Sequence, residues 1–390
     1  MNTLDSEALD LHGSKKGKLE VKSKVAISSR KDLSLAYTPG VAAVSSAIAG
    51  NSELAYKYTI KQNTIAVVSD GSAVLGLGDI GPKAAIPVME GKCVLFKEFA
   101  GIDAFPICID VHTPDEVVAV VKAIAPVFGG INLEDIAAPK CFEIEARLKK
   151  EVDVPVMHDD QHATAVVVLA GLINALKVVG KNKQDVTIVI NGAGAAGTAT
   201  AKMLEHYGMK DIIMVDTTGA IYSDRKEGMN PIKEELAALT NKGGKKGSLA
   251  EVIAGADVFI GVSKAGILSQ AMVRSMGAKP IVFAMANPVP EIMPEEAKAA
   301  GAAVVATGRS DYPNQINNSL AFPGIFRGAL DSRATEINEA MKLAAAHALA
   351  ALVPAPSAEK VVPEPLDKSI VPSVSKAVYD AAKQSGAARK

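Results

Sequence analysis

Residues 186–197 read VTIVINGAGAAG, and this stretch indicates the fold of the second half of the chain. Its β-branched residues predict a strand over 186–190, and a helix is predicted over 198–207, after a turn with three glycines. In such a turn one glycine permits the tight bend, one lets the backbone approach a pyrophosphate and one allows close helix packing. The pattern therefore predicts a Rossmann unit that binds a dinucleotide.

The expected cofactor contacts are this turn and the acid that ends the next strand. Asp216 follows a strand predicted over 212–215 and would accept hydrogen bonds from a ribose 2′-hydroxyl, which favours NAD. Arg225 and Lys226 follow shortly and could offset the repulsion of a 2′-phosphate, so NADP stays an alternative. A second alternative is a tight turn that binds nothing. The predicted cofactor-binding residues are Gly192, Gly194, Ala195, Ala196, Gly197 and Asp216.

Predicted strands alternate with helices on both sides of this turn, which implies mostly parallel sheets whose ligands gather at the carboxyl ends of the strands. The upstream strands are predicted over 64–69, 92–96, 105–109, 131–136 and 154–157. The downstream strands are predicted over 212–215, 258–262, 281–285 and 303–306, and helices over 114–125, 141–150 and 163–179. Residues 1–20 are predicted to be loosely held, and a turn at 38–40 to precede an Ala-rich helix.

The fold class predicted is α/β with two domains, because 390 residues exceed what one hydrophobic core usually organises. An N-terminal substrate and metal domain with a mostly parallel sheet is expected over residues 1–160. A C-terminal Rossmann dinucleotide-binding domain is expected over residues 161–390, with a final helix over 371–383 that packs back on the first domain.

Composition narrows the class of partner. The formal net charge is −1 and no long block of either sign occurs, so neither nucleic acid nor an anionic membrane is an expected partner. The three cysteines lie far apart and are interpreted as reduced and buried. Residues 1–18 lack the apolar core of a signal peptide, and the apolar run 163–176 is too short to span a membrane. A cytoplasmic enzyme with a small-molecule substrate is therefore expected.

Two pairs of acids follow predicted strands of the first domain. Glu134 and Asp135 form one pair and Asp159 and Asp160 the other, so neighbouring parallel strands could bring several carboxylates to one edge. Mg²⁺ or Mn²⁺ would resolve the repulsion, because hard cations take oxygen ligands. Both members of a pair can bind one ion only if the chain turns there. Alone, each pair would be interpreted as a solvated strand end or a helix cap.

Two histidines flank the second acid pair. His158 and His162 could suggest zinc, but beside several carboxylates they are interpreted as hydrogen-bonded neighbours and not as ligands.

Together these motifs resemble those of the malic enzyme family, specifically its short bacterial and archaeal members. The resemblance covers nearly the whole chain and rests on the order and spacing of the motifs. They are YTPGV at 37–41, GLGDIG at 76–81, GID at 101–103, LED at 133–135, HDDQ at 158–161, GAGAAG at 192–197, ANP at 286–288 and QINN at 315–318.

The resemblance implies oxidative decarboxylation of (S)-malate to pyruvate and CO₂ by a homodimer that uses NAD, or NADP, and Mg²⁺ or Mn²⁺. The catalytic residues it implies are Tyr37 as general acid, Lys92 as general base and Asp159 beside that lysine. The metal ligands it implies are Glu134, Asp135 and Asp160. It also implies that Asn287 orients nicotinamide and that Asn317 and Asn318 contact malate.

The chemistry is compatible with these roles, although the residues alone would not assign them. A lysine can serve as a base only if burial or a nearby cation lowers its pKa. Without the resemblance, Tyr37 would be interpreted as a packed aromatic residue, Lys92 as a surface lysine and Asn317 with Asn318 as a turn. Lys83 and Lys97 lie close enough in sequence to be alternatives to Lys92.

One position departs from the longer family members. Ala73 stands where they carry an arginine that clamps a malate carboxylate, so the carboxylate is expected to be held by backbone amides near Ser72 and by the asparagines. Two rival interpretations are a metal-independent amino-acid or folate dehydrogenase of the same two-domain plan, and a non-catalytic nucleotide-binding module.

Overall fold

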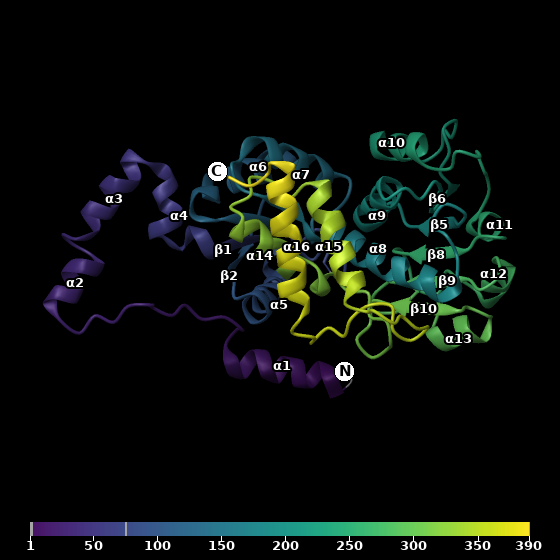
Figure 1. Ribbon diagram of the computed structural model, residues 1–390, viewed down its shortest axis with the longest axis horizontal. Helices are drawn as coiled ribbons and strands as arrows, with labels where there is room; N and C mark the ends of the chain where they lie inside the picture. Colours follow the sequence, from purple (N-terminus) through teal and green to yellow (C-terminus); the bar gives the residue numbers. More distant parts are fainter. Residues whose placement is uncertain (1–2, 75, 390) are drawn as a thin grey trace.

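The computed structural model describes residues 3–74 and 76–389, so the ends of the two expected domains at residues 1–2 and 390 lie outside it. Two sheets lie side by side, with the last helices of the chain packed over the first (Figure 1). The first sheet has four parallel strands, so their carboxyl ends all reach one edge. In spatial order they are β2 (Asp103–Cys108), β1 (Thr64–Ser69), β3 (Gly130–Leu133) and β4 (Val156–His158).

The second sheet has the Rossmann arrangement expected from the glycine-rich turn. Its strands run parallel except for the last, which pairs antiparallel with its neighbour. In spatial order they are β10 (Val304–Thr307), β9 (Ile281–Ala284), β8 (Val258–Gly261), β5 (Thr187–Asn191), β6 (Asp211–Asp216) and β7 (Gly219–Ala220). The predicted α/β class with two such units is confirmed, while the domain boundary at residues 160 and 161 stays a prediction.

Helices connect and cover these strands. Those of the first unit are α5 (Gly81–Ala100), α6 (Pro114–Ile124), α7 (Lys140–Glu151) and the short η3 (Ala125–Val127). Those of the second are α9 (Ala195–His206), α10 (Pro231–Leu239), α11 (Leu249–Val252), α12 (Gln270–Ser275), α13 (Pro294–Ala299) and η4 (Asn318–Leu320).

A long apolar helix joins the two units. Helix α8 (Asp159–Val179) is apolar on most of its circumference and most of its residues are buried, as expected for a helix that lies inside a protein. It packs against α9 of the second unit and against α15 (Glu339–Ala351). By length and composition alone α8 could cross a membrane, but its burial identifies it as a core helix.

The predicted strand over 92–96 is wrong, because these residues lie in helix α5. The buried residues of α5 recur at helical spacing, and they are Ala85, Met89, Lys92, Cys93 and Phe96. The apolar run from Cys93 to Phe96 had the composition of a strand, but the spacing over the whole segment follows the helical period. Within the segment predicted to be loosely held, residues 3–15 form a helix, α1 (Thr3–Lys15).

The last helices of the chain pack against α5. Phe322 and Phe326 of α14 (Phe322–Asp331) stack edge-on against Phe96, at ring-centroid distances of 4.7 and 5.4 Å. Helix α16 (Ile370–Ser385) packs on α14 and α15, and Arg389 beyond it pairs with Glu53 near the start of the first unit. The chain therefore returns to the first unit after it leaves the second.

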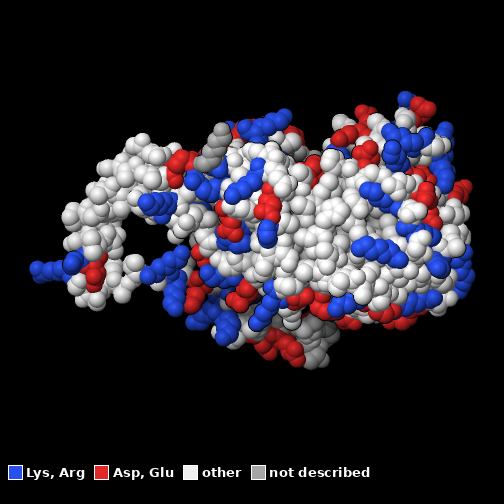
Figure 2. Space-filling model, viewed as in Figure 1, with Lys and Arg blue, Asp and Glu red and all other residues white. Residues whose placement is uncertain are grey.

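An N-terminal arm, residues 25–50, extends away from this body, whereas Lys18 and Lys24 still contact it at Glu90 and Asp103. Its helices α2 (Arg30–Ala36) and α3 (Val41–Gly50) project outward, and Figure 2 shows an open space between the arm and the rest of the protein. None of the residues of these two helices is buried. The chain returns to the body through η1 (Ser52–Leu54), α4 (Ala55–Tyr58) and η2 (Ile60–Asn63).

The arm exposes apolar side chains. The exposed ones on and beside its helices are Ile27, Leu33, Leu35, Tyr37, Val41 and Val44. Residues 30–50 are apolar and long enough to cross a membrane by composition alone, although the turn at 38–40 breaks them into two helices. Such an exposed apolar segment is typical of a surface that binds a partner.

Replacing Phe96 by Ala should destabilise the protein and displace Lys92, which lies one helical turn away in α5. Truncation of a buried Phe costs about 3–5 kcal/mol, so the urea midpoint of unfolding should fall clearly. Tyr58→Ala removes an aromatic side chain that is about half exposed and serves as the matched control. An unchanged midpoint for Phe96→Ala would show that α5 is not held by α14.

Candidate active site

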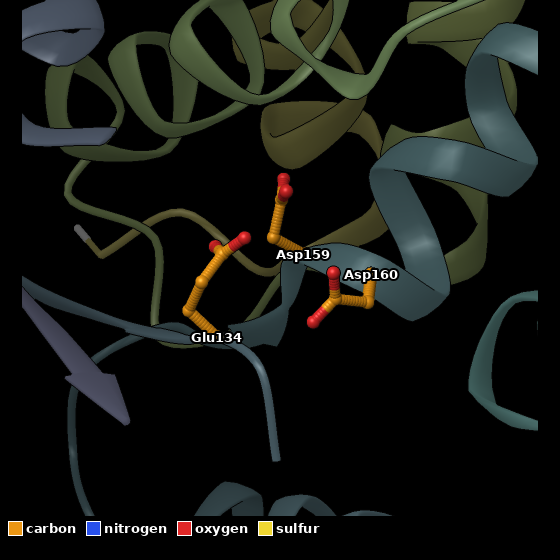
Figure 3. A group of neighbouring side chains, drawn as sticks. All are labelled: Glu134, Asp159 and Asp160. Carbon is orange, nitrogen blue, oxygen red and sulfur yellow. The ribbon is translucent and has the colours of Figure 1, made fainter. Parts of the chain in front are cut away.

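The two predicted acid pairs meet at the carboxyl edge of the first sheet. Glu134 follows β3 and Asp159 follows β4, and these two strands are neighbours in the sheet. Oxygen atoms of Glu134, Asp159 and Asp160 all lie within 4.8 Å of one another (Figure 3). The parallel topology therefore produces a carboxylate cluster from residues that are far apart in sequence.

Local backbone geometry explains how the members of the two pairs come to lie at this edge or beside it. Asp135 has a φ of 53°, in the left-handed region that residues other than glycine seldom adopt outside turns and functional sites. The chain thus turns between Glu134 and Asp135, as the binding of one ion by both would require. Asp159 and Asp160 are the first residues of α8, where negative charge is favoured by the helix dipole. Asp159 and Asp160 therefore lie in one helical turn and not on an extended strand.

The two pairs are also linked by the backbone. The amide of Asp135 donates a hydrogen bond to Oδ2 of Asp160 at 2.9 Å. This contact places Asp135 directly beside the cluster, although its carboxylate is outside the group of three that lies within 4.8 Å.

Lys92 reaches the cluster from helix α5. Its Nζ lies 2.7 Å from Oδ2 of Asp159 and 2.9 Å from Oε1 of Glu134, and all three side chains are buried. The ammonium group also lies 4.4 Å from the ring centroid of Phe322. Burial alone would lower the pKa of Lys92, but the charges of Asp159, Glu134 and Asp160 outweigh it and raise the pKa above the ordinary value. The protein groups alone therefore do not lower the pKa of Lys92 below its ordinary value.

The pKa values of two acids in the cluster are shifted as well. Burial raises the pKa of Glu134 well above its ordinary value, and the neighbouring acids raise it further against the opposing effect of Lys92. Burial likewise raises the pKa of Asp159. Three acids against one lysine leave an excess of negative charge in a water-poor place, which is costly unless a cation or protons compensate it.

The residues present fit a hard divalent cation. Oδ1 of Asp159 is buried and has no hydrogen-bond partner among the described residues, so an acceptor atom in the cluster is unsatisfied. All candidate ligands are carboxylate oxygens, which Mg²⁺ and Mn²⁺ prefer. A bound cation would also balance the charge that raises the pKa of Lys92. His158 and His162 are not among the clustered groups. His162 contacts Glu145, as expected for a hydrogen-bonded neighbour, whereas the two ring nitrogens of His158 have no hydrogen-bond partner among the described residues.

Of the two predicted substrate asparagines, the structure brings one to the cluster. Asn318 lies at the start of η4 and donates a hydrogen bond to Oδ2 of Asp159. Asn317 caps the same short helix, where its side chain accepts a hydrogen bond from the amide of Ser319 at 2.9 Å.

The amides near Ser72 are already engaged within the protein. The Ser72 amide donates to Asp70 at 3.1 Å, and the Ala73 amide donates to the carbonyl of Asp135 at 3.0 Å. They fix the loop against the edge that carries the acid cluster, so they do not offer free donors to a substrate carboxylate.

Tyr37 is not brought to the cluster of its own chain. It ends helix α2 on the projecting arm, and 66% of its surface is exposed. Figure 1 shows α2 at the far end of the arm, well away from β1, β2 and α8.

Sequence reasoning missed several buried polar residues that support the cluster. Asn132 lies on β3 two residues before Glu134, on the same face of the strand, and donates to Oε2 of Glu134 at 2.8 Å. The alternation of a strand could have revealed it. Glu145 of α7 accepts a hydrogen bond from the backbone amide of His158 at 3.0 Å, and its Oε2 lies 2.9 Å from Nε2 of His162. No sequence pattern indicated this contact, because α7 and β4 meet only in the folded protein.

The dinucleotide turn has the geometry that its glycines predict. Gly192 has a φ of 124°, and a Cβ on Gly197 would lie 1.8 Å from the carbonyl oxygen of Gly192, so neither position tolerates another residue. Gly194 precedes α9, whose N-terminus is suited to phosphate. Ala195 and Ala196 form the first helical turn, and Asp216 ends β6 as predicted. Asn287 follows β9 and is exposed at the same edge of the sheet.

Comparisons with known proteins agree with this arrangement. The family model of the malic enzyme N-terminal domain matches residues 16–149, and that of the malic enzyme NAD-binding domain matches residues 161–383. A bifunctional malic/malolactic enzyme of Bacillus subtilis (strain 168) is 60% identical over 389 residues, which cover 99% of this chain and 95% of that protein. An NAD-dependent malic enzyme of Geobacillus stearothermophilus is 60% identical over 376 residues, which cover 96% of this chain and 78% of that protein.

A solved structure shows the same fold over the whole chain. The crystal structure of a malic enzyme from Pyrococcus horikoshii superimposes with a TM-score of 0.95 at 49% identity, and the match covers 100% of this chain and 92% of that one.

Replacing Asp160 by Asn should weaken Mn²⁺ binding by about tenfold or more, because a charged ligand is lost while the acceptor of the Asp135 amide is kept. Calorimetric titration of the purified protein with MnCl₂ measures this directly. Glu143→Gln removes an exposed acid of α7 and should leave the affinity unchanged. Equal Mn²⁺ affinity of Asp160→Asn and the unmodified protein would exclude the cluster as the metal site.

Proposed function

The chain belongs to the malic enzyme family, and we propose that it converts (S)-malate to pyruvate and CO₂ while reducing NAD⁺ or NADP⁺. The observation that carries this proposal is the buried lysine held between two acids at the edge where the predicted metal ligands meet. A structural salt bridge would not need a third acid, an unsatisfied carboxylate oxygen and an asparagine directed at the same group.

We propose that Glu134, Asp135 and Asp160 hold the divalent cation. The turn at Asp135 and the helical turn at Asp160 give these residues access to one place. When bound, the cation would act as a Lewis acid on a substrate oxygen, and the dinucleotide would accept the hydride.

Lys92 is the proposed general base for the C2 hydroxyl of malate. Its Nζ is held in place by Asp159 and Glu134, so the side chain loses little conformational freedom when it reacts. With the cluster charges balanced, burial beside Phe322 would lower its pKa toward the range that a base requires. Asp159 then positions the lysine and accepts the hydrogen bond that keeps it there.

Asn317, Asn318 and Asn287 are the proposed contacts to substrate and nicotinamide. Asn318 is joined to Asp159 and so lies beside the reacting groups. Since the amides near Ser72 are engaged, the asparagines are the proposed means of orienting malate.

Tyr37 is the proposed general acid, and we propose that it acts in the site of a second copy of the chain. The arm carries it away from its own cluster and exposes the apolar residues of α2 and α3. A homodimer in which each arm packs against the other copy would cover these residues and complete both sites. The proposed location is the cytoplasm, in keeping with the three free cysteines, Cys93, Cys108 and Cys141.

The rival interpretations are not favoured. A metal-independent amino-acid or folate dehydrogenase has no use for the acid cluster, and a non-catalytic module has no use for the lysine within it. The family matches extend over both units and so oppose both rivals.

Purified protein with malate and NAD⁺ or NADP⁺ should reduce the cofactor only when Mn²⁺ or Mg²⁺ is present, and EDTA should abolish the reaction. Lys92→Ala should lose oxidation while it still binds dinucleotide, because the base is removed and the Rossmann unit is untouched. Absorbance of the reduced cofactor and chemical detection of pyruvate measure both effects. Full turnover in EDTA would contradict the metal role, and normal turnover of Lys92→Ala would contradict the role of this lysine.

Mixing Tyr37→Ala with Lys92→Ala should restore activity that neither variant has alone. In a mixed dimer, the site with intact Lys92 receives intact Tyr37 from the other copy. Random exchange of subunits makes half the dimers mixed, each with one intact site, so about a quarter of the normal activity is expected. Co-expression with two affinity tags isolates the mixed dimer for the assay.

A tyrosine that acts within its own chain predicts the opposite result. Each mixed dimer would then hold two defective sites, and activity would stay at the level of the single variants. A monomer at assay concentration in analytical ultracentrifugation would also contradict the dimer.

A further inference from the structure

A buried acid without a role in the proposed reaction lies at the carboxyl edge of the second sheet. Glu291 belongs to the loop between β9 and α13, and its side chain is fully buried. Its Oε1 accepts a hydrogen bond from the amide of Ser263 at 3.0 Å, and its Oε2 accepts one from the amide of Ala286 at 3.0 Å. Ser263 follows β8 and Ala286 follows β9, so one carboxyl group joins the ends of two neighbouring strands.

The loops after these two strands are joined by backbone contacts as well. The amide of Gly266 donates to the carbonyl of Pro290 at 3.1 Å, and the amide of Leu268 donates to the carbonyl of Glu291 at 3.0 Å. Burial raises the pKa of Glu291 above its ordinary value, although the hydrogen bonds from the amides of Ser263 and Ala286 oppose the rise. Burial of a carboxyl group is costly without such bonds, so the acid and the two loops form one hydrogen-bonded unit.

The last residue of β8 leaves the room that this acid occupies. A Cβ on Gly261 would lie 2.4 Å from Cδ of Glu291 and 2.5 Å from its Oε1. Gly261 does not have a positive φ, so its backbone conformation is open to alanine and only the space is not. A methyl group at this position would therefore push the carboxyl group of Glu291 away from the two amides.

One of the two loops borders the hollow beside the glycine-rich turn. This hollow is lined by Gly192, Gly194, Val262, Ser263 and Lys264, among others. Nδ2 of Asn191, the last residue of β5, donates to Oγ of Ser263 at 2.6 Å. The loop after β8 is thus fixed to the glycine-rich turn on one side and to Glu291 on the other.

The order of the strands places the two halves of a dinucleotide. The pyrophosphate lies at the turn after β5, and the acid that ends β6 marks the adenosine ribose. Since β8 and β9 lie on the other side of β5, the nicotinamide half has to extend over their ends. Both ends present an exposed polar residue there, Ser263 after β8 and Asn287 directly after Ala286.

We propose that Glu291 is a positioning residue for the nicotinamide half of the dinucleotide, because it holds the ends of β8 and β9 so that Ser263 and Asn287 face the ring in a fixed arrangement. This inference rests on the proposed function only in that the second unit binds a dinucleotide. Glu291 is buried and acts through the two loops without touching the cofactor. A misplacement of about 1 Å can lower the rate of a reaction about a hundredfold, so fixed loops matter for hydride transfer.

The affinities for the dinucleotide and for its adenosine half separate the two halves of the site. Calorimetric titration uses NAD⁺ and 5′-AMP, or NADP⁺ and adenosine 2′,5′-bisphosphate where NADP⁺ binds more tightly, without malate or metal. Glu291→Gln keeps the shape of the side chain but turns an NH₂ group toward one of the two amides. The dinucleotide should then bind about tenfold more weakly, while the affinity for the adenosine half should be unchanged.

A second variant reaches the same contact from the other side. Gly261→Ala leaves Glu291 in the sequence but displaces its carboxyl group, so it should show the same selective loss of dinucleotide affinity. Glu295→Gln removes an exposed acid in the first turn of α13 and should behave as the unmodified protein. Thermal unfolding checks that each variant is folded.

Unchanged dinucleotide affinity in the two folded variants, or an equal loss for the dinucleotide and its adenosine half, would overturn the role of Glu291. Unfolding of both variants would make Glu291 a purely structural residue and would also overturn it. Failure of the unmodified protein to bind either ligand would overturn the dinucleotide site and this inference together. Since the titrations need no malate, an absence of malate oxidation would contradict the proposed reaction and leave the result for Glu291 standing.

Discussion

The contact of Lys92 with Asp159 and Glu134 is the interaction on which the rest of the site depends. It joins α5, the end of β3 and the start of α8, which approach one another only through the parallel sheet. A buried ion pair seldom adds net stability over apolar packing, but removal of one partner leaves a buried charge without compensation. Loss of any one of the three groups would therefore leave the charge of the others uncompensated, and the aromatic packing of α14 on α5 keeps the lysine in place.

In both sheets the candidate functional groups lie at the carboxyl ends of parallel strands, although their chemistry differs. In each, polar groups gather where parallel strands end, with acids in the first unit and a glycine-rich turn in the second. Helix α8 begins at the acid cluster and packs against α9, which begins at the glycine-rich turn. One buried helix thus links the edge that carries the acid cluster to the dinucleotide-binding unit. The asparagine that contacts Asp159 comes from beyond the second sheet, so the cluster itself draws on both units.

The sequence predicted the features that are local and missed those that depend on tertiary contact. The glycine-rich turn and most strands were predictable because period, β-branching and turn residues act over a few positions. Lys92 was placed on a strand, since a short apolar run does not reveal whether its period is helical or extended. The support from Glu145 and Asn318 involves partners 13 and 159 residues away, which no local pattern encodes. Asp216 was recognised as the fingerprint acid, but the salt bridges that Arg225 and Lys233 form with it were not predicted.

The arm differs from the acid cluster, because its apolar side chains could be buried in a core but are not buried by the rest of the described chain. Helices α2 and α3 carry apolar side chains at helical spacing, yet neither helix buries a residue in the body. Isolated helices of this length are marginal in water, so their stability must come from packing. If that packing is supplied by a second copy, the same contact that stabilises the arm also delivers Tyr37. Assembly and catalysis would then share one interface, which would explain why the tyrosine proposed as general acid resides on an arm whose helices bury no residue.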